Sequence, residues 1–363
     1  MRNQGSNIRD TGTDRGARTR RRGRRALALA AAGVLGSTLL TACAGADSST
    51  TVNGVTTITI GVGGNIFDLP ARLADANGYF TKEGLKVNYV TLTSATGTAA
   101  LQSGSVQFLT DSPNDILTAL GKNIPETAIS LVGSGNPLGL VVSTKFAKAH
   151  GLTSSSSAAK VAAALAGSTA GASSPNTKAE AGIFLKAYGV DPTKLSWVSL
   201  PSPTADKAAL ASNEIDWFVT SEPIPLEMQY SGDGIVVADP LSVPAWSAAE
   251  SGYGLVVVAS NSYLDQHADV AKKFAAAIQD ATGYLSTHLT SSTDSTVLSV
   301  AEKTLPNIPA SVLQNSLAQV VWPTSGAMSA ADWTKTQAFL DSLGTLPSGD
   351  KISSKNWTNT YLS

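Results

Sequence analysis

The sequence predicts an α/β protein built from two lobes. Short apolar strands alternate with amphipathic helices along most of the chain, which is typical of a mostly parallel sheet covered by helices. The chain has 363 residues, so we expect two lobes of about 100–200 residues each rather than one simple core. A hydrophobic content of 42% and a charged content of 15% exclude a disordered protein.

The N-terminal region predicts export and lipidation. Nine arginines precede an apolar stretch at 26–40, which is too short and too rich in alanine for a membrane span but suits a signal peptide. The motif Leu40-Thr41-Ala42-Cys43 resembles the lipobox of bacterial lipoproteins. Cys43 is the only cysteine, so an internal disulfide is excluded. We expect residues 1–42 to be the signal peptide and Cys43 to carry the lipid; the pair Arg24-Arg25 leaves both general and twin-arginine export open.

The charge of the mature chain excludes a nucleic-acid partner. Removing residues 1–42 takes away nine arginines and two aspartates, which changes the net charge from −1 to −8. Only Arg72 remains among the arginines, whereas nucleic-acid binding requires clustered cations. Residues 43–55 are small and polar and are expected to form a flexible, lipid-anchored tether.

The elements of the first half follow from their periodicity. Alternating β-branched residues predict strands, and apolar residues three or four apart predict helices. Strands are expected at 56–62, 86–92, 106–110, 127–132 and 138–143, and helices at 69–78, 98–103 and 113–120.

The same pattern restarts after a helical stretch at 153–166. Strands are expected at 168–172, 195–200, 217–220, 235–238 and 252–259, and helices at 175–188, 204–212, 225–230, 270–285, 296–304, 310–321 and 330–343. The apolar strands at 138–143 and 252–259 bracket the middle unit, as two crossovers between lobes would; a single large sheet is the alternative.

Three motifs resemble a known family. They are Gly78-Tyr79-Phe80-Thr81-Lys82-Glu83-Gly84-Leu85-Lys86-Val87, Gly104-Ser105-Val106-Gln107-Phe108, and Asp216-Trp217-Phe218-Val219-Thr220-Ser221-Glu222-Pro223. In this order they resemble substrate-binding proteins of ABC importers, in the nitrate/sulfonate/taurine and thiamine-pyrimidine-precursor group. Trp217 departs from the pattern, which usually has alanine there. The resemblance spans about 56–363 and does not identify the ligand.

This resemblance implies a periplasmic-binding-protein-like (type II) fold with a two-strand hinge and a central ligand cleft. The first lobe would comprise 56–143 and 246–363, and the second lobe 144–245. The lipid on Cys43 would hold a monomeric protein on the extracytoplasmic face of the cell membrane, beside a permease and its ATPase.

Candidate ligand-binding residues follow the ends of strands, where ligands of open α/β sheets bind. Ser112-Pro113, Ser174-Pro175 and Ser202-Pro203 each combine a capping residue with proline at the first helical position. We expect 112–114 and 174–177 to form the floor of the cleft, with a purely capping role for each serine as the equal alternative. The candidates are Asn65, Phe67, Asp68, Ser94, Thr96, Gly97, Ser112, Pro113, Ser174, Asn176, Thr177, Glu222 and Trp246.

Some of these candidates have plain structural alternatives. Glu222 is expected either to make a polar contact with the ligand or to be an exposed carboxylate unrelated to the ligand. Trp246 is placed to stack on an aromatic ligand. Trp217 and Phe218 are expected in the core, with strand alternation burying one of them. Because cations are scarce, an anion would have to bind through helix ends and neutral donors, and the carboxylates of the cleft fit a neutral or cationic ligand at least as well.

The residue pattern does not predict an enzyme. The three histidines are far apart in the sequence and lack the spacing of metal ligands, so no metal or cofactor is expected. Ser157-Ala158-Ala159-Lys160 matches S-x-x-K but has no K-T-G or S-D-N partner. We therefore expect a lipid-anchored solute-binding protein that delivers a small organic solute to an ABC permease. The alternative is an extracytoplasmic sensor or scavenging lipoprotein without a cognate permease.

Overall fold

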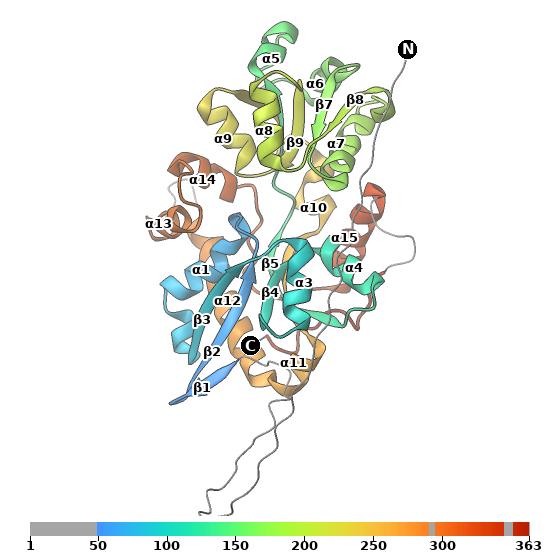
Figure 1. The fold of residues 1–363 in the computed structure, drawn as a ribbon. Helices are drawn as coiled ribbons and strands as arrows, with labels where there is room; N and C mark the ends of the chain where they lie inside the picture. The colour runs from blue at the N-terminus through green and yellow to red at the C-terminus, as the bar shows by residue number, and fades with distance from the viewer. Residues whose placement is uncertain (1–48, 290–294, 345–350, 363) are drawn as a thin grey trace, which may run out of the picture. The chain divides into compact units, whose positions relative to one another are not determined.

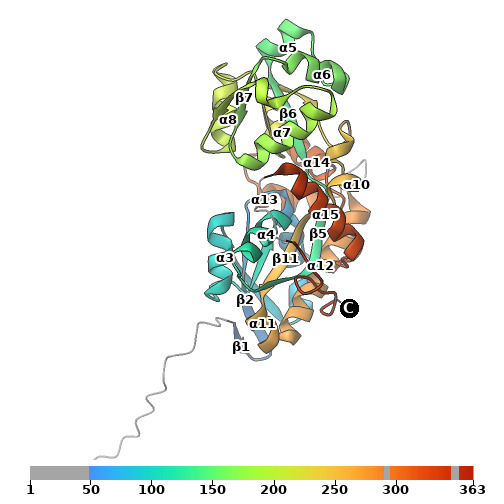
Figure 2. The same cartoon turned by 90° about the vertical axis from the view of Figure 1, so that its right-hand side faces the viewer.

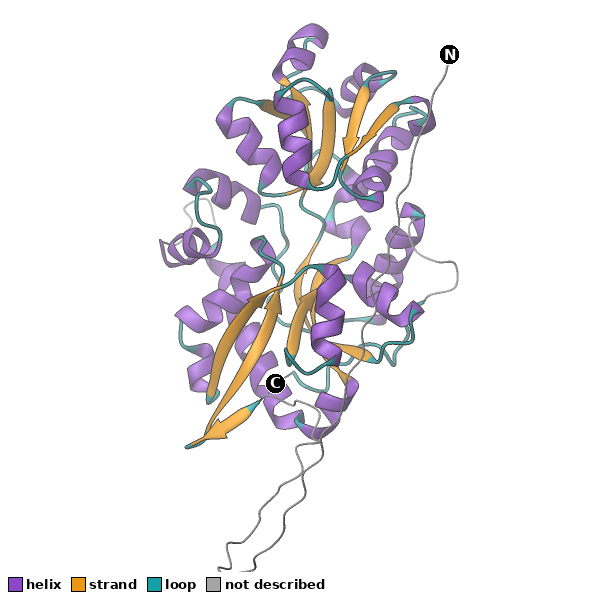
Figure 3. Cartoon of the chain, in the orientation of Figure 1, coloured by secondary structure: helices purple, strands orange, loops and turns teal. Residues whose placement is uncertain are grey.

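The computed structural model describes residues 49–289, 295–344 and 351–362. The expected signal peptide and Cys43 lie outside these residues. Within them the strands form two separate sheets, each with helices packed around it (Figures 1 and 3). The α/β class expected from the alternation of strands and helices is confirmed, and we call the units built on the two sheets the first and second lobes.

The first sheet runs in the order β1-β2-β4-β11-β5, and β3 also pairs with β2. Strands β2, β3 and β4 are parallel, whereas β11 is antiparallel to β4 and β5. Residues 50–52 belong to the expected flexible tether, but they form β1, which pairs with β2. The bounds are β1 (Thr50–Val52), β2 (Val55–Val62), β3 (Leu85–Thr91), β4 (Phe108–Asp111), β5 (Glu126–Ser134) and β11 (Tyr253–Ser260).

The second sheet runs in the order β10-β6-β9-β7-β8. Strands β7, β8 and β9 are parallel, whereas β6 is antiparallel to β9 and β10. Its strands are β6 (Leu138–Ser143), β7 (Thr169–Ala172), β8 (Ser196–Ser199), β9 (Trp217–Ser221) and β10 (Gly234–Ala238). As expected, most strands of each sheet run in the same direction; β6 and β11, the two strands that follow the crossovers, and the short β1 run against their neighbours.

The chain crosses between the two sheets at 135–137 and again at 239–252. From the sequence, we expected 138–143 and Trp246 to lie in the first lobe. Strand β6 makes its backbone hydrogen bonds in the second sheet, and Trp246 packs in the core of the second lobe. By pairing and packing, both segments belong to the second lobe.

Helices pack around the sheet of the first lobe, and they include the C-terminal helices that follow β11 (Figure 2). The short helices α2 and α11 were not anticipated. The bounds are η1 (Ile66–Asp68), α1 (Leu69–Ala76), α2 (Tyr79–Lys82), α3 (Ser94–Gln102), α4 (Pro113–Gly121), α10 (Ala248–Ser251), α11 (Asn261–Gln266), α12 (Ala268–His288), α13 (Ser295–Thr304), α14 (Ala310–Leu317) and α15 (Ala330–Leu343).

Helices of the second lobe pack on both faces of its sheet. Among them α5 was not anticipated. The bounds are α5 (Thr144–His150), α6 (Ala158–Leu165), α7 (Pro175–Ala187), η2 (Pro192–Lys194), α8 (Pro203–Ala211), α9 (Ile224–Ser231) and η3 (Pro244–Trp246).

Aromatic side chains organise both cores. In the first lobe, the rings of Phe108 and Phe274 stack with centroids 4.0 Å apart and planes within 2°. In the second lobe, Trp217 packs in one cluster and Phe218 in another, and both are fully buried. One of this pair was expected to be buried; both are, because helices cover both faces of the second sheet.

Candidate functional site

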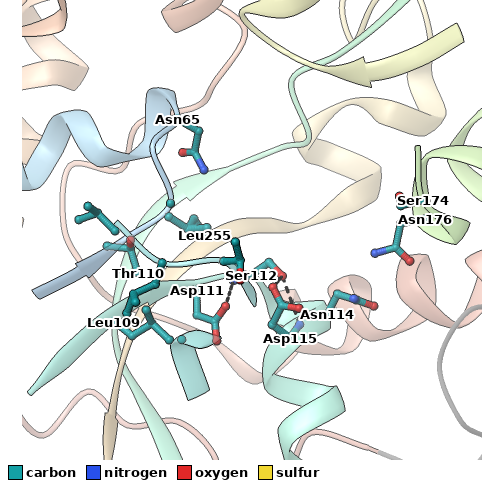
Figure 4. Close-up of a pocket in the computed structure, with 15 residues that line it drawn as sticks. Asn65, Leu109, Thr110, Asp111, Ser112, Asn114, Asp115, Ser174, Asn176 and Leu255 are labelled. Atoms are coloured by element: carbon teal, nitrogen blue, oxygen red, sulfur yellow. Dashed lines mark hydrogen bonds between the residues drawn. The ribbon is translucent and has the colours of Figure 1, made fainter. Parts of the chain in front are cut away.

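A cavity of about 530 Å³ opens at the carboxyl ends of β2 and β4, and we call it the main cavity (Figure 4). Its wall includes the first turns of α4, from the first lobe, and of α7, from the second. Carboxyl ends of strands and nearby helix N-termini are where open α/β sheets usually bind ligands. The apolar part of the wall is supplied by Val62, Leu92, Leu109 and Leu255.

The start of α4 brings three polar residues into this wall. Strand β4 ends at Asp111, and Ser112 caps the helix by accepting a hydrogen bond from the Asp115 backbone N–H at 3.2 Å. The Ser112 hydroxyl also donates to Asp115 Oδ2 at 2.8 Å. Pro113 occupies the first helical position, where its fixed φ suits the helix and its missing N–H costs no helical hydrogen bond. This cap fixes the turn that presents Asn114 and Asp115 to the cavity.

The start of α7 repeats this construction from the second lobe. Ser174 Oγ accepts from the Thr177 backbone N–H at 3.1 Å, and Thr177 Oγ1 accepts from the Ser174 N–H at 3.2 Å. Pro175 again occupies the first helical position. Ser174 and Asn176 therefore line the same cavity as their counterparts Ser112 and Asn114. Figure 4 shows Asn176 and Asn65 reaching toward the space beside Ser112.

Asp111 is the most unusual group in the wall. It is 5% exposed, and its carboxylate accepts from the Ser112 backbone N–H at 2.9 Å. The other oxygen, Oδ2, is buried. Burial raises the pKa of Asp111 well above its ordinary value, and the nearby carboxylates of Asp115 and Glu126 and a side-chain hydrogen bond with Asp115 raise it further. A raised pKa favours the protonated form, whose O–H can donate to the Asp115 carboxylate.

Asn65 lines the cavity from the segment that follows β2. Its Oδ1 caps a short 3-10 helix by accepting from the Phe67 backbone N–H at 2.9 Å. Asp68 was expected to contact ligand but is 2% exposed and accepts hydrogen bonds from the backbone N–H groups of Gly63, Gly64 and Asn65. Asp68 therefore holds the loop that presents Asn65, and it does not line the cavity.

Phe67 and Trp246 were also expected to face ligand, and both are core residues. Phe67 packs against Trp322 with ring centroids 5.9 Å apart. Trp246 is fully buried near Phe184, and its indole N–H donates to the Glu180 carbonyl at 3.2 Å. Stacking of Trp246 on a ligand is incompatible with this packing, because its ring lies inside the core of the second lobe.

Glu222 lies at a contact between the lobes rather than in the cavity wall. It directly follows the strand β9 of the second lobe and is 2% exposed. Its carboxylate accepts from the Leu226 backbone N–H at 3.2 Å, and from Ser316 Oγ and Gln319 Nε2 of the α14 region at 3.3 Å each. Burial raises its pKa to about 7. The expected ligand contact is thus a buried polar link between lobes.

The remaining expected residues divide between the main cavity and other positions. Gly97 lines the main cavity, whereas Thr96 is exposed and bonded to Thr93. Thr177 supports its helix cap. The side chain of Ser94 lies outside what the structure describes. Thr93 was not anticipated, although it lines the cavity and caps α3.

A smaller cavity of about 120 Å³ shares Ser112, Asn114 and Asn176 with the main cavity, and Pro113 lines it. It also contains Glu180, whose Oε1 accepts from Asn136 Nδ2 at 2.6 Å. Burial raises the pKa of Glu180 to about 7. Together the two cavities form one polar region at the meeting of the lobes.

A third hollow, of about 790 Å³, lies between α7 and the end of α15, around Trp197 and Leu343. It is larger than the main cavity, but it is remote from the carboxyl ends of β2 and β4. Residues 345–350, which follow α15, lie outside the described part of the chain. The main cavity is therefore the candidate site.

The described residues that line the main and smaller cavities include no lysine, arginine or histidine. Arg72 instead lies over the ring of Tyr89, with its guanidinium carbon 3.7 Å from the ring centroid. Over residues 49–289, 295–344 and 351–362 there is no group of three or more histidine, cysteine or acidic side chains able to hold a metal. The same stretches contain no helix long and apolar enough to cross a membrane.

The comparisons with known proteins agree on a family and a fold. Residues 69–289 match the family model described as "NMT1/THI5 like". A search among curated proteins found no match. The periplasmic aliphatic sulphonate binding protein SsuA from Escherichia coli is similar in structure, with a TM-score of 0.65 and 16% identity over 84% of this chain and 98% of that one.

Two further solved structures show the same likeness. The alkanesulfonate-binding protein SsuA from Xanthomonas axonopodis pv. citri, bound to MOPS, has a TM-score of 0.62 and 17% identity over 83% of this chain and 98% of that one. The periplasmic nitrate-binding protein NrtA from Synechocystis PCC 6803 has a TM-score of 0.60 and 16% identity over 85% and 84%. At these identities the likeness is one of fold: the two-lobe α/β architecture of periplasmic binding proteins.

Proposed function

This chain belongs to the NMT1/THI5-like family, and we propose that it is an extracytoplasmic solute-binding lipoprotein of an ABC importer. It captures a small organic solute between its two lobes and delivers it to a membrane permease. One observation carries the proposal: a Ser-Pro-Asn helix start from each lobe, at 112–114 and 174–176, borders the same cavity. A solute that touches both starts favours the arrangement in which the lobes are close together.

The proposed contacts are polar groups on fixed turns. Asn65, Asn114 and Asn176 offer amides, Ser112 and Ser174 offer hydroxyls that also cap their helices, and Asp111 offers a carboxylate. Because these groups come from both lobes, ligand binding shifts the population toward the closed form. A permease that recognises the closed form then receives only loaded protein. The process is binding without bond cleavage, so no catalytic residue is assigned.

The solved structures support this class of function. Their names assign sulfonate binding to the two SsuA proteins and nitrate binding to NrtA. We propose that this chain captures a solute in the same way. We also propose that the boundaries between the lobes lie at 135–137 and at 239–252, and that the protein is a monomer.

Membrane attachment is the second part of the proposal. Cys43 follows Leu40-Thr41-Ala42 at the end of an apolar stretch, and a lipid on its thiol would hold the protein at the extracytoplasmic face of the membrane. Cys43→Ser should remove the lipid and release the chain from the membrane fraction. Labelling with a radioactive fatty acid checks this directly: label that persists in the variant would refute Cys43 as the lipid site.

Thermal unfolding with candidate solutes tests the binding function. The full chain, purified in mild detergent, is heated with sulfonates, nitrate, bicarbonate, amino-pyrimidines, thiamine and flavin precursors. A solute at about 100 times its Kd should stabilise the folded chain by about 2.7 kcal/mol. For lobes of this size the unfolding temperature should rise by about 5–10 °C.

Two matched leucine variants locate the site. Asn176→Leu places a larger apolar side chain in the cavity wall and should abolish the shift. Thr204→Leu changes the equivalent position of the third Ser-Pro helix start. Thr204 is exposed and lines neither cavity, so this variant should retain the ligand-induced shift in unfolding temperature. Equal shifts in both variants would place binding elsewhere. Uptake of the identified solute by cells with and without the chain then separates delivery to a permease from sensing or scavenging.

A further inference from the structure

The third hollow, between α7 and the end of α15, combines an apolar floor with a positively charged rim. Its volume is about 790 Å³. Helices α7 and α15, one from each lobe, contact each other here (Figure 2). Ile183, Trp197 and Leu343 supply apolar surface. Among the described residues of the wall, the ionisable side chains are those of Lys178 and Lys186, so the hollow suits a ligand that is apolar in its body and negatively charged.

The two lysines and a glycine form a row along α7. Lys178, Gly182 and Lys186 follow one another at intervals of four residues. Residues four apart are neighbours on a helix surface, so the glycine lies between the two lysines. The lysines are eight positions apart, which corresponds to about 12 Å along the helix axis. An elongated ligand with an acidic group at each end matches this spacing.

The packing around position 182 does not require glycine. Gly182 lies inside α7, where glycine costs about 1 kcal/mol relative to alanine. Apart from its chain neighbours and the backbone of its own helix, a Cβ atom at this position would meet nothing nearer than Pro192 Cγ, at 3.9 Å. The missing side chain therefore leaves the floor open between the two lysines, where the body of a ligand would lie.

Neither lysine is paired with a carboxylate in the described part of the chain, whose ion pairs involve other lysines. Lys178 Nζ lies 5.0 Å from the centroid of the Trp197 ring, a cation–π contact that holds it at the rim. Asp191 lies near Lys186: hydrogen bonds from Thr193 lower the pKa of this aspartate, and the charges of two lysines, Lys186 among them, lower it further. Asp191 is exposed and does not line the hollow, so the rim keeps an excess of positive charge.

We propose that the third hollow is a second binding site, for an elongated organic dianion with an apolar body. The two acidic groups bind Lys178 and Lys186. The apolar body lies over Gly182, against Ile183 and Leu343. No residue that the structure describes lines both this site and the main cavity, and the inference does not depend on the proposed solute-binding function. Because the walls come from both lobes, a bound dianion favours the arrangement in which α7 and α15 are close together.

Biphenyl-4,4′-dicarboxylate is a suitable probe, because a rigid apolar body separates its two carboxylates. Its binding to the full chain in mild detergent is measured by calorimetry, after subtraction of the heat of titration into detergent buffer alone. Biphenyl-4-carboxylate, which lacks one acidic group, is the matched ligand. We expect the dicarboxylate to bind more tightly by up to about fivefold, the range for one exposed ion pair. Its affinity should fall as the salt concentration is raised.

Gly182→Leu is the decisive variant. Leucine favours the helix and its side chain fills the floor between the lysines, so this variant should abolish binding of the dicarboxylate without lowering the unfolding temperature. Ala163→Leu makes a matched change at an exposed position of α6 that lines none of the three cavities, and should leave the affinity unchanged. Lys186→Gln should weaken binding by up to about fivefold, whereas Lys148→Gln, at an exposed position of α5, should not change it.

The variants also separate this site from the main cavity. Binding that Asn176→Leu abolishes and Gly182→Leu retains would place the dicarboxylate in the main cavity and overturn the second site. Equal affinities for the dicarboxylate and the monocarboxylate would overturn the assignment of a dianion. Absence of any heat of binding with the dicarboxylate would overturn the proposal and leave the solute-binding function, which the screen of solutes tests separately, unaffected.

Discussion

Replacing Glu222 by glutamine should stabilise the protein at alkaline pH and leave it nearly unchanged at acidic pH. Glu222 is a buried carboxyl group that accepts hydrogen bonds from Leu226, Ser316 and Gln319. Glutamine can keep all three hydrogen bonds. Its oxygen accepts from the Leu226 N–H and Ser316 Oγ, and its amide N–H donates to Gln319 Oε1 after the Gln319 amide turns over. That Gln319 oxygen has no donor among the described residues at present, so the exchange also satisfies it.

The size of the effect follows from the pKa of Glu222. In the unfolded chain this carboxyl ionises near its ordinary pKa of 4.5, whereas burial raises the pKa in the folded chain to about 7. Between these values the folded chain holds a proton that the unfolded chain has released, so stability falls as the pH rises. The loss is complete above pH 7 and amounts to about 3 kcal/mol, at about 1.4 kcal/mol for each pKa unit.

Urea unfolding at pH 5 and pH 8 measures this difference. We expect the free energy of unfolding of Glu222→Gln to exceed that of the parent by about 3 kcal/mol at pH 8 and by less than about 1 kcal/mol at pH 5. Glu302→Gln, on an exposed position of α13, is the control and should show no such pH dependence. A Glu222→Gln variant that is equally destabilised at both pH values would refute the reasoning, because it would mean that the ionised carboxylate stabilises this contact.

Two other measurements follow from the same structure. Trp246→Ala should destabilise the folded chain by about 3–5 kcal/mol in urea unfolding, because the fully buried indole leaves a cavity in the second core; a loss below about 1 kcal/mol would contradict its place there. Asp68→Asn should weaken binding indirectly by loosening the loop that presents Asn65, lowering the unfolding temperature as well; weaker binding with unchanged stability would instead make Asp68 a direct contact.

Local sequence patterns predicted the fold class and part of the site. A capped helix start depends on a few consecutive residues, so it can be recognised in the sequence. The Ser-Pro pairs at 112 and 174 correctly located two capped turns at strand ends. The asparagine that follows each pair, Asn114 or Asn176, distinguishes these two starts from Ser202-Pro203, which is followed by threonine. Of the three Ser-Pro starts, only the two followed by asparagine line the main cavity, so this repeated tripeptide was a usable signal.

The errors concern contacts between residues distant in the sequence. Alternation shows that Trp246 and Glu222 lie near element ends, but it does not show which core or which neighbouring helix will cover them. Trp246 is buried by α7 residues more than 60 positions earlier, and Glu222 is capped by groups more than 90 positions later. The reversed direction of β6 and β11 was missed for the same reason, because it depends on where the chain crosses between the lobes.

Three buried carboxyl groups lie in the wall of the main cavity or where the two lobes meet. Asp111 lines the main cavity, Glu180 bonds to Asn136 beside the first crossover, and Glu222 bonds across to the α14 region. Burial raises the pKa of each, so each destabilises the folded chain when it is ionised. These three costs fall where the lobes meet or in the wall of the main cavity, while the two aromatic cores are apolar. A change that alters the partners of Asp111, Glu180 or Glu222 therefore acts on groups whose ionised form is already unfavourable in the folded chain. Under the proposed function, the balance between lobe arrangements is consequently sensitive to small changes in charge at this boundary.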